Sequence, residues 1–174
     1  MFGCILVPLD GSEAASGAVS VAADVARRFH GRVVLLQVIG QLLDWHHSLP
    51  TPTDCVGMDD IEERAAHAAR SQLSRLATTI HGVPVDVDVR FGRVAETILE
   101  VATEIGAELI CLAAPGHEAH PGTNRSHRLS YSAFSGLGER LMHTSPVPVL
   151  ILGADAAAMA AAENCAPAAQ PVGY

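Results

Sequence analysis

A polar stretch near the end of the chain holds the residues with the most obvious chemical potential. Residues 117–134 read HEAHPGTNRSHRLSYSAF and contain three histidines, two arginines and a single acid. His117, His120 and His127 could ligate zinc, but a zinc site needs a fixed fourth ligand and outer-shell support, which a loop of Pro, Gly and Ser does not offer. A basic loop could instead close over a phosphate group, and a solvated surface loop is the third interpretation. These residue types favour a phosphate lid or a plain loop over a metal site.

Two further polar positions stand next to apolar stretches. Asp10 follows the apolar residues CILVPL, and it could present a carboxylate to a ligand or simply form the turn into the next helix. Ser135-Gly136 precedes a short helical pattern. Small residues at a helix N-terminus can hold an anion on free N–H groups, although serine is also a common helix cap. Both alternatives stay open at each position.

Sequence patterns of known catalytic sites are missing from the chain. There is no Gly-x-Ser-x-Gly nucleophile elbow, no Gly-Lys-Ser phosphate loop and no paired-glycine turn of the dinucleotide type. The serines of SYSAFSG, residues 130–136, have no identifiable base. We therefore predict no catalytic residues and expect that the protein is not an enzyme.

The composition describes an acidic protein with an aliphatic core. The 174 residues carry a formal net charge of −8 and are 49% hydrophobic but only 4% aromatic. An acidic surface disfavours nucleic acids and anionic membranes as partners, and no apolar stretch has the length of a membrane span. The N-terminus lacks the features of a signal peptide, so we expect a cytoplasmic protein. Cys4 and Cys111 lie inside apolar stretches, which indicates buried, reduced thiols.

Apolar periodicity predicts strands that alternate with helices. Apolar stretches indicate five strands, at residues 4–10, 32–40, 83–92, 108–116 and 147–153. Steps of three and four indicate helices between them, within residues 11–31, 58–82, 93–107 and 135–144. This order predicts one α/β domain, residues 1–153, with helices on both faces of a parallel sheet. We expect residues 41–57 to form a loop and the Ala-rich residues 154–174 to form a disordered tail.

An apolar stripe marks the side of each predicted helix that should pack on the sheet. In the first helix the stripe consists of Ala14, Ala18, Val21, Ala22, Val25 and Phe29. In the second helix it consists of Ile61, Ala65, Ala68, Leu73, Leu76 and Ile80.

Four stretches of the chain resemble the universal stress protein family. They are ILVPLDGSEAA, GRVVLLQVIG, RFGRVAETILEVATEIGAELICLAAPG and GLGERLMHTSPVPVLIL, and their order and spacing agree with the family over about residues 2–153. The resemblance implies an α/β fold with an open five-stranded parallel sheet, strand order 3-2-1-4-5, Rossmann-like and of the adenine nucleotide alpha hydrolase type. It also implies a cytoplasmic, homodimeric stress-response protein that binds ATP with Mg.

Nucleotide-binding members of that family carry a glycine signature: Gly, two residues, Gly, nine residues, then Gly-Ser or Gly-Thr. Here Ala113 replaces the first glycine, Gly116 matches the second, residues 117–134 lengthen the spacing to eighteen, and Ser135-Gly136 reverses the closing pair. Asp10 matches the family's ribose acceptor, and Val38 matches the position that reads the adenine edge. The nucleotide-binding residues implied by the resemblance are Pro8, Leu9, Asp10, Val38, Ala113, Gly116, His117, Ser135, Gly136 and Leu137.

The resemblance also implies a partner for the last strand, which would lie at a sheet edge. Pairing with its own copy would place Val147, Val149 and Ile151 in a homodimer interface. We expect an unidentified regulatory protein as a further partner, with no nucleic acid and no membrane. The function we expect is that of an ATP-binding stress protein with a degenerate signature. The alternatives are an interaction protein that binds no nucleotide, and a slow adenine-nucleotide hydrolase or transferase that uses the expanded loop.

Overall fold

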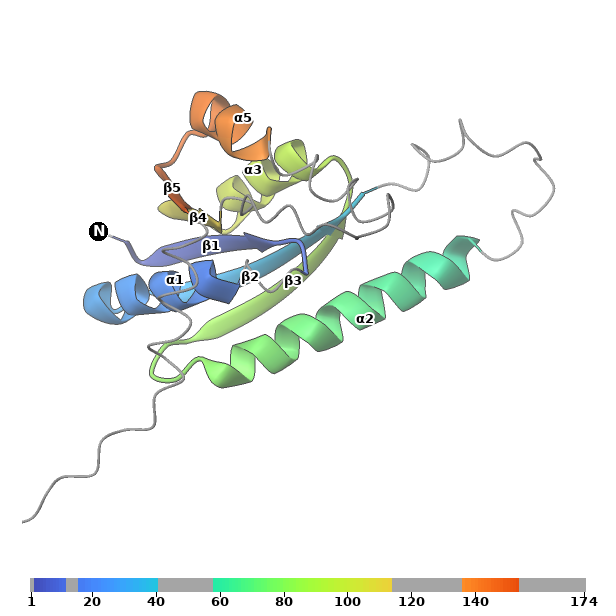
Figure 1. Cartoon of the computed structure of the whole chain (residues 1–174), viewed down its shortest axis with the longest axis horizontal. Helices are drawn as coiled ribbons and strands as arrows, with labels where there is room; N and C mark the ends of the chain where they lie inside the picture. Colours follow the sequence, from blue (N-terminus) through green and yellow to red (C-terminus); the bar gives the residue numbers. More distant parts are fainter. Residues whose placement is uncertain (1, 12–15, 41–57, 114–135, 154–174) are drawn as a thin grey trace, which may run out of the picture.

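The computed structural model describes residues 2–11, 16–40, 58–113 and 136–153 (Figure 1). The predictions about the loop 41–57, the expanded phosphate loop 117–134 and the tail 154–174 lie outside these described residues. In the described part of the chain, no helix is long and apolar enough to cross a membrane.

Strands and helices alternate in the order that the sequence predicts. The strands are β1 (Cys4–Leu9), β2 (Arg32–Ile39), β3 (Val85–Phe91), β4 (Leu109–Ala113) and β5 (Val149–Leu152). The helices are α1 (Ser16–Phe29), α2 (Met58–Thr79), α3 (Val94–Glu104) and α5 (Leu137–Thr144). All strand pairs are parallel, and the sheet has the order β3-β2-β1-β4-β5. The prediction of an open sheet with order 3-2-1-4-5 is therefore confirmed.

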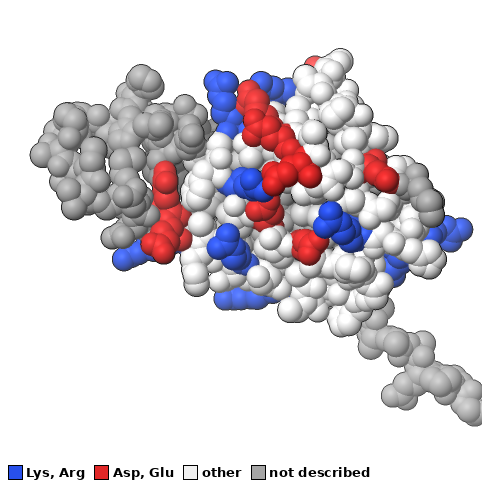
Figure 2. All heavy atoms as spheres, turned by 180° about the vertical axis from the view of Figure 1, so that it is seen from behind, with Lys and Arg blue, Asp and Glu red and all other residues white. Residues whose placement is uncertain are grey.

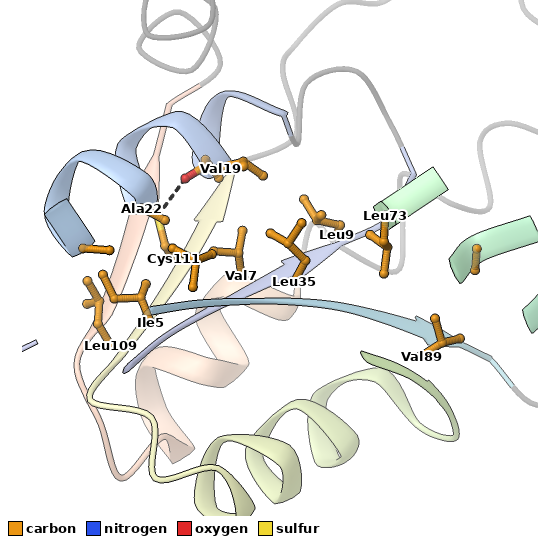
Figure 3. Packing of buried hydrophobic residues seen from close by; sticks show 14 residues of the cluster. Ile5, Val7, Leu9, Val19, Ala22, Leu35, Leu73, Val89, Leu109 and Cys111 are labelled. Atoms are coloured by element: carbon orange, nitrogen blue, oxygen red, sulfur yellow. Dashed lines mark hydrogen bonds between the residues drawn. The ribbon is translucent and has the colours of Figure 1, made fainter. Parts of the chain in front are cut away.

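The helices form a layer on each side of the sheet, α1 and α2 on one face and α3 and α5 on the other (Figure 1). Because successive side chains of a strand point to opposite faces, β1 contributes to two separate cores. Ile5 and Val7 pack under α1 and α2, whereas Leu6 packs under α3 and α5. Figure 3 shows the first core, where Cys111 of β4 also donates a hydrogen bond to the carbonyl of Ala18 at 3.6 Å.

Two predicted helix stripes are partly wrong. In α1 the buried side includes Val19 and Ala26, while Phe29 is 38% exposed and packs edge-to-face on Phe2 at 5.4 Å between ring centroids. In α2 it is Ala69 that is buried and Ala68 that is exposed. Since each residue turns a helix by about 100°, a stripe displaced by one position faces away from the sheet. Because neighbouring alanines have the same size and hydrophobicity, the sequence pattern did not show which of them face the sheet.

The connection from α1 to β2 brings two backbone segments into close contact. His30 has a φ of +52°, and the Gly31 N–H donates to the carbonyl of Ala26 at 2.8 Å, which closes the helix. A Cβ at Gly31 would lie 2.5 Å from the carbonyl oxygen of Phe2. Glycine is therefore required here by close approach of the N-terminal backbone.

Candidate functional site

The strand order reverses between β1 and β4, and the candidate site lies at the carboxyl ends of these two strands. From β1 the chain moves outward through β2 to β3, and it then crosses to β4 and moves outward to β5. In open α/β sheets ligands bind outside the carboxyl ends of the strands, at the point where the order reverses. Here that point is bordered by Leu9 of β1, Ile39 of β2 and Ala113 of β4.

Pro8 interrupts the hydrogen-bond ladder at this reversal. The carbonyl of Cys4 accepts from the Glu108 N–H at 2.8 Å, so the backbone groups of Cys4 face β4. Backbone groups alternate in direction along a strand, so those of Pro8 also face β4. Because proline has no N–H, Pro8 cannot donate a hydrogen bond to β4. Pairing of β1 with β4 accordingly covers Ile5–Leu109 and Leu6–Ile110 only, whereas pairing with β2 runs from Cys4 to Leu9. The ends of β1 and β4 therefore extend beyond their ladder toward the candidate site.

A tight turn after β1 presents an acidic side chain at this edge. Asp10 is exposed, and Gly11 adopts a φ of +80°, which glycine reaches without steric cost. The Gln72 amide on α2 donates to the Gly11 carbonyl at 3.1 Å. The turn is thus held from a helix that lies far away in the sequence.

The neighbouring strand ends supply small and apolar surface. Val38 is partly buried against the α3 and α5 core and pairs with Arg90 of β3. Ala113 is partly buried at the end of β4. Among the described non-glycine residues only His30 has a positive φ, so Ala113 has an ordinary backbone conformation. The position that holds glycine in the family signature therefore does not need glycine for its φ in this chain.

Helix α5 begins at the same edge, and its N-cap residue offers no side chain to its first N–H groups. Gly136 is the N-cap, with φ −92° and ψ −8°, and makes no side-chain cap hydrogen bond. Leu137 and Leu141 are buried and anchor the helix on the sheet. Free N–H groups and the helix dipole favour an anion at such an end. Among the alternatives left open by the sequence, the cap position belongs to Gly136, and Ser135 lies outside the described residues.

Charged side chains near the start of α5 are paired with one another. Glu96 of α3 accepts from Arg140 of α5 at 2.9 Å and from Arg93 at 3.4 Å. On the face drawn in Figure 2, acidic and basic side chains are interspersed. These contacts tie α3 to α5, and the described residues on this face show no basic patch of the kind that nucleic-acid binding requires.

Comparison with known proteins identifies the fold and its family. The sequence matches the model of the universal stress protein family over residues 1–153. This chain belongs to the universal stress protein family. Universal stress protein Sll1654 from Synechocystis sp. is 29% identical over 157 residues, which cover 87% of this chain and 86% of that protein.

Solved structures show the same architecture. UspA from Lactobacillus plantarum superposes with a TM-score of 0.62 at 24% identity, over 87% of this chain and 97% of that one. A universal stress protein in complex with cAMP superposes with a TM-score of 0.58 at 16% identity, over 86% of this chain and 95% of that one. At these identities the two structures establish the shared fold.

The universal stress protein fold brings many of the predicted site residues to one edge of the sheet. Pro8 and Leu9 are buried. The residues at the edge are Pro8, Leu9, Asp10, Val38, Ala113, Gly136 and Leu137. Gly116, His117 and Ser135 lie outside the described residues, as do the other histidines of the expanded loop.

Two glutamines of the site region were missed by sequence reasoning. Gln37 follows four buried residues of β2, and its Oε1 is buried without a hydrogen-bond partner among the described residues. Gln72 lies on the exposed side of α2. A polar residue inside the apolar stretch VVLLQVIG is a signal that could have identified Gln37, whereas nothing local marks Gln72.

The thiols and potential metal ligands show no reactive cluster in the described residues. Burial raises the pKa of Cys111 to about 12, and burial also raises the pKa of Cys4, although the nearby Arg32 guanidinium opposes that shift. Within the described ranges, no group of three or more His, Cys, Asp or Glu side chains could hold a metal ion. The prediction of buried thiols is confirmed for Cys4 and Cys111.

Proposed function

We propose that this protein binds an adenine nucleotide at the carboxyl edge of its sheet, beside the ends of β1 and β4. The observation that carries the proposal is the interruption of the β1–β4 ladder at Pro8, next to the exposed Asp10 and at the point of strand reversal. The structural neighbour solved with cAMP supports an adenine nucleotide as the class of ligand. Family membership supports a role in the stress response.

The residues at this edge fit the parts of a nucleotide. The Asp10 carboxylate would accept hydrogen bonds from ribose hydroxyls, and the end of β2 at Val38 would face the adenine. The N–H groups at the start of α5 would hold a phosphate, helped by the helix dipole. Mg²⁺ would enter with the phosphates of ATP, since the described residues offer no carboxylate cluster for it.

We expect the affinity for ATP to be modest. Ala113 adds a methyl group where the family signature has hydrogen, and the closing Gly-Ser pair is reversed. Loss of one or two phosphate hydrogen bonds costs roughly 1–3 kcal/mol of binding free energy. The activity that we propose is binding and not turnover.

Calorimetry with Asp10→Ala tests the proposed site. Wild-type protein should give saturable heat with ATP and Mg²⁺ or with cAMP, and Asp10→Ala should weaken binding by about tenfold or more, because a charge-assisted hydrogen bond is lost. Asp24→Ala is the matched control, since Asp24 is an exposed acid on α1. No saturable heat up to millimolar ligand, or equal binding by Asp10→Ala, would contradict the proposal. The first result would favour an interaction protein that binds no nucleotide.

We also propose that the protein is a cytoplasmic homodimer paired through the free edge of β5. The two edges of the sheet differ in chemistry. The edge strand β3 carries Asp86 and Asp88 in ion pairs, which discourages edge-to-edge pairing, whereas β5 reads VLIL and carries no charge. Val147 and Val149 pack partly against the α3 and α5 core, so the part of β5 offered to a second copy is its backbone.

A further inference from the structure

A polar side chain of helix α2 contacts the candidate site. Gln72 Nε2 donates to the Gly11 carbonyl at 3.1 Å, across 61 residues of sequence. The next residue, Leu73, is 2% exposed and anchors this part of α2 in the core. The donor therefore stands on a helix whose position is fixed independently of the turn that it contacts.

The turn contains the residue type with the greatest backbone freedom. Gly11 has a φ of +80°, and glycine samples more backbone conformations than any other residue. The point where a Cβ would stand on Gly11 lies 3.6 Å from both the Nε2 and the Oε1 of Gln72, and 3.7 Å from Gln37 Nε2. Two carboxamides, one from α2 and one from β2, thus surround the residue that follows Asp10.

We propose that Gln72 is a positioning residue for Asp10. Its amide holds the Gly11 carbonyl and with it the peptide unit that follows Gly11, which limits how the turn after Asp10 can move and hence the directions open to the carboxylate. Gln37 packs beneath the same glycine and limits how far the turn can collapse toward the sheet. Affinity for the nucleotide then depends on the docking of α2. This inference rests on the proposed function, in which the ligand engages Asp10.

Gln72→Leu removes the donor while it keeps a side chain of similar size. Ser74→Leu is the matched control, because it adds the same side chain to a neighbouring exposed position of α2. Gln72→Lys restores an N–H donor on a side chain that is one bond longer and positively charged. We expect Gln72→Leu to weaken binding of ATP with Mg²⁺ or of cAMP by about threefold to tenfold, Ser74→Leu to bind like wild type, and Gln72→Lys to recover most of the affinity.

Amide NMR spectra of the protein without ligand make the test independent of binding. In Gln72→Leu the signals of Asp10 and Gly11 should shift and broaden, and in Gln72→Lys they should return toward their wild-type positions. If wild-type protein binds no nucleotide, the proposed function fails, while these signals still test the role of Gln72. Affinity and signals in Gln72→Leu that match those of Ser74→Leu would overturn the inference, as would failure of Gln72→Lys to restore either one.

Discussion

At the scale of the residue, the positive φ of Gly11 has a consequence for stability that can be measured. Its φ of +80° costs an L-residue about 1–2 kcal/mol, while the space around it would accept a methyl group, with the nearest atoms at 3.6 Å. We therefore predict that Gly11→Ala lowers the free energy of unfolding by about 1–2 kcal/mol, as measured by urea denaturation.

Gly40→Ala is the control for this prediction. Gly40 lies just after the end of β2, a methyl group added there would have nothing within 4 Å, and its φ is not among the positive values of the described glycines. Its substitution should change stability by about 0.5 kcal/mol or less. Equal losses for the two variants would show that φ does not decide the effect at Gly11.

A second prediction at this scale concerns Cys111, whose burial raises its pKa to about 12. The folded protein resists ionisation of this thiol and the unfolded chain does not. The resulting stability is fully present below the ordinary thiol pKa, near 9.0, and is lost as the pH rises toward about 12. The sequence contains no lysine, so the side chains that share this range are the other cysteines and the two tyrosines, and the Cys111→Ala variant isolates the contribution of Cys111.

Urea denaturation between pH 8 and pH 11 tests whether the free energy of unfolding falls as the pH rises. The free energy of unfolding should fall above about pH 9, by at most about 1.4 kcal/mol per pH unit from this group. Cys111→Ala should be less stable at pH 8 because it leaves a cavity, but its stability should fall less steeply with pH. Parallel curves for the two proteins would refute the assignment to Cys111.

At the scale of the element, α5 depends on its buried side for its position over β4 and β5. Leu141 is fully buried, while its neighbour Met142 is 59% exposed. Leu141→Ala should cost about 2–5 kcal/mol of unfolding free energy, and Met142→Ala about 0.5 kcal/mol or less. Thermal and urea unfolding measure both values. Similar losses would mean that α5 does not pack on the sheet through Leu141.

Element order was predictable from the sequence because burial imposes different patterns on strands and helices. Stretches such as CILVPL and RVVLLQVI are apolar on both faces, as central parallel strands must be. The phase of α2 was not predictable, since Ala68 and Ala69 are equivalent by hydrophobicity and only the packed sheet distinguishes them.

The residues of the candidate site also fall into those that the sequence could predict and those that it could not. Asp10 and Val38 could be placed because they stand at the ends of recognisable strands. The contact between Gln72 and Gly11 could not, because it joins positions 61 residues apart and depends on where α2 docks.

At the scale of the whole molecule, the free edge of β5 predicts assembly. The Ile110 N–H donates to the carbonyl of Pro148, so the backbone groups of Pro148 and Leu150 face β4 and those of Val149 point outward. Val149→Pro should remove an outward N–H and leave the β4–β5 ladder intact. We expect a dimer for the wild type and a much larger monomer fraction for Val149→Pro in light scattering at micromolar concentration.

Far-UV circular dichroism should be unchanged in that variant, and this distinguishes loss of the interface from loss of the fold. Leu150→Pro is the contrasting variant, because it removes an N–H that faces β4 and should destabilise the sheet itself. A monomeric wild type would refute the proposed dimer, and a dimer that survives Val149→Pro would place the interface elsewhere.

Amide NMR titration can locate the adenine nucleotide that we propose to bind where β1 and β4 end. On addition of ATP with Mg²⁺ or of cAMP to isotope-labelled protein, the largest shifts should fall on Gly11, Gly40, Ala113 and Leu137. Amides at the amino ends of the strands, such as Arg32 and Val85, should keep their chemical shifts and serve as the internal control. Shifts concentrated at those amino ends or along β5, or no shifts at millimolar ligand, would contradict the account.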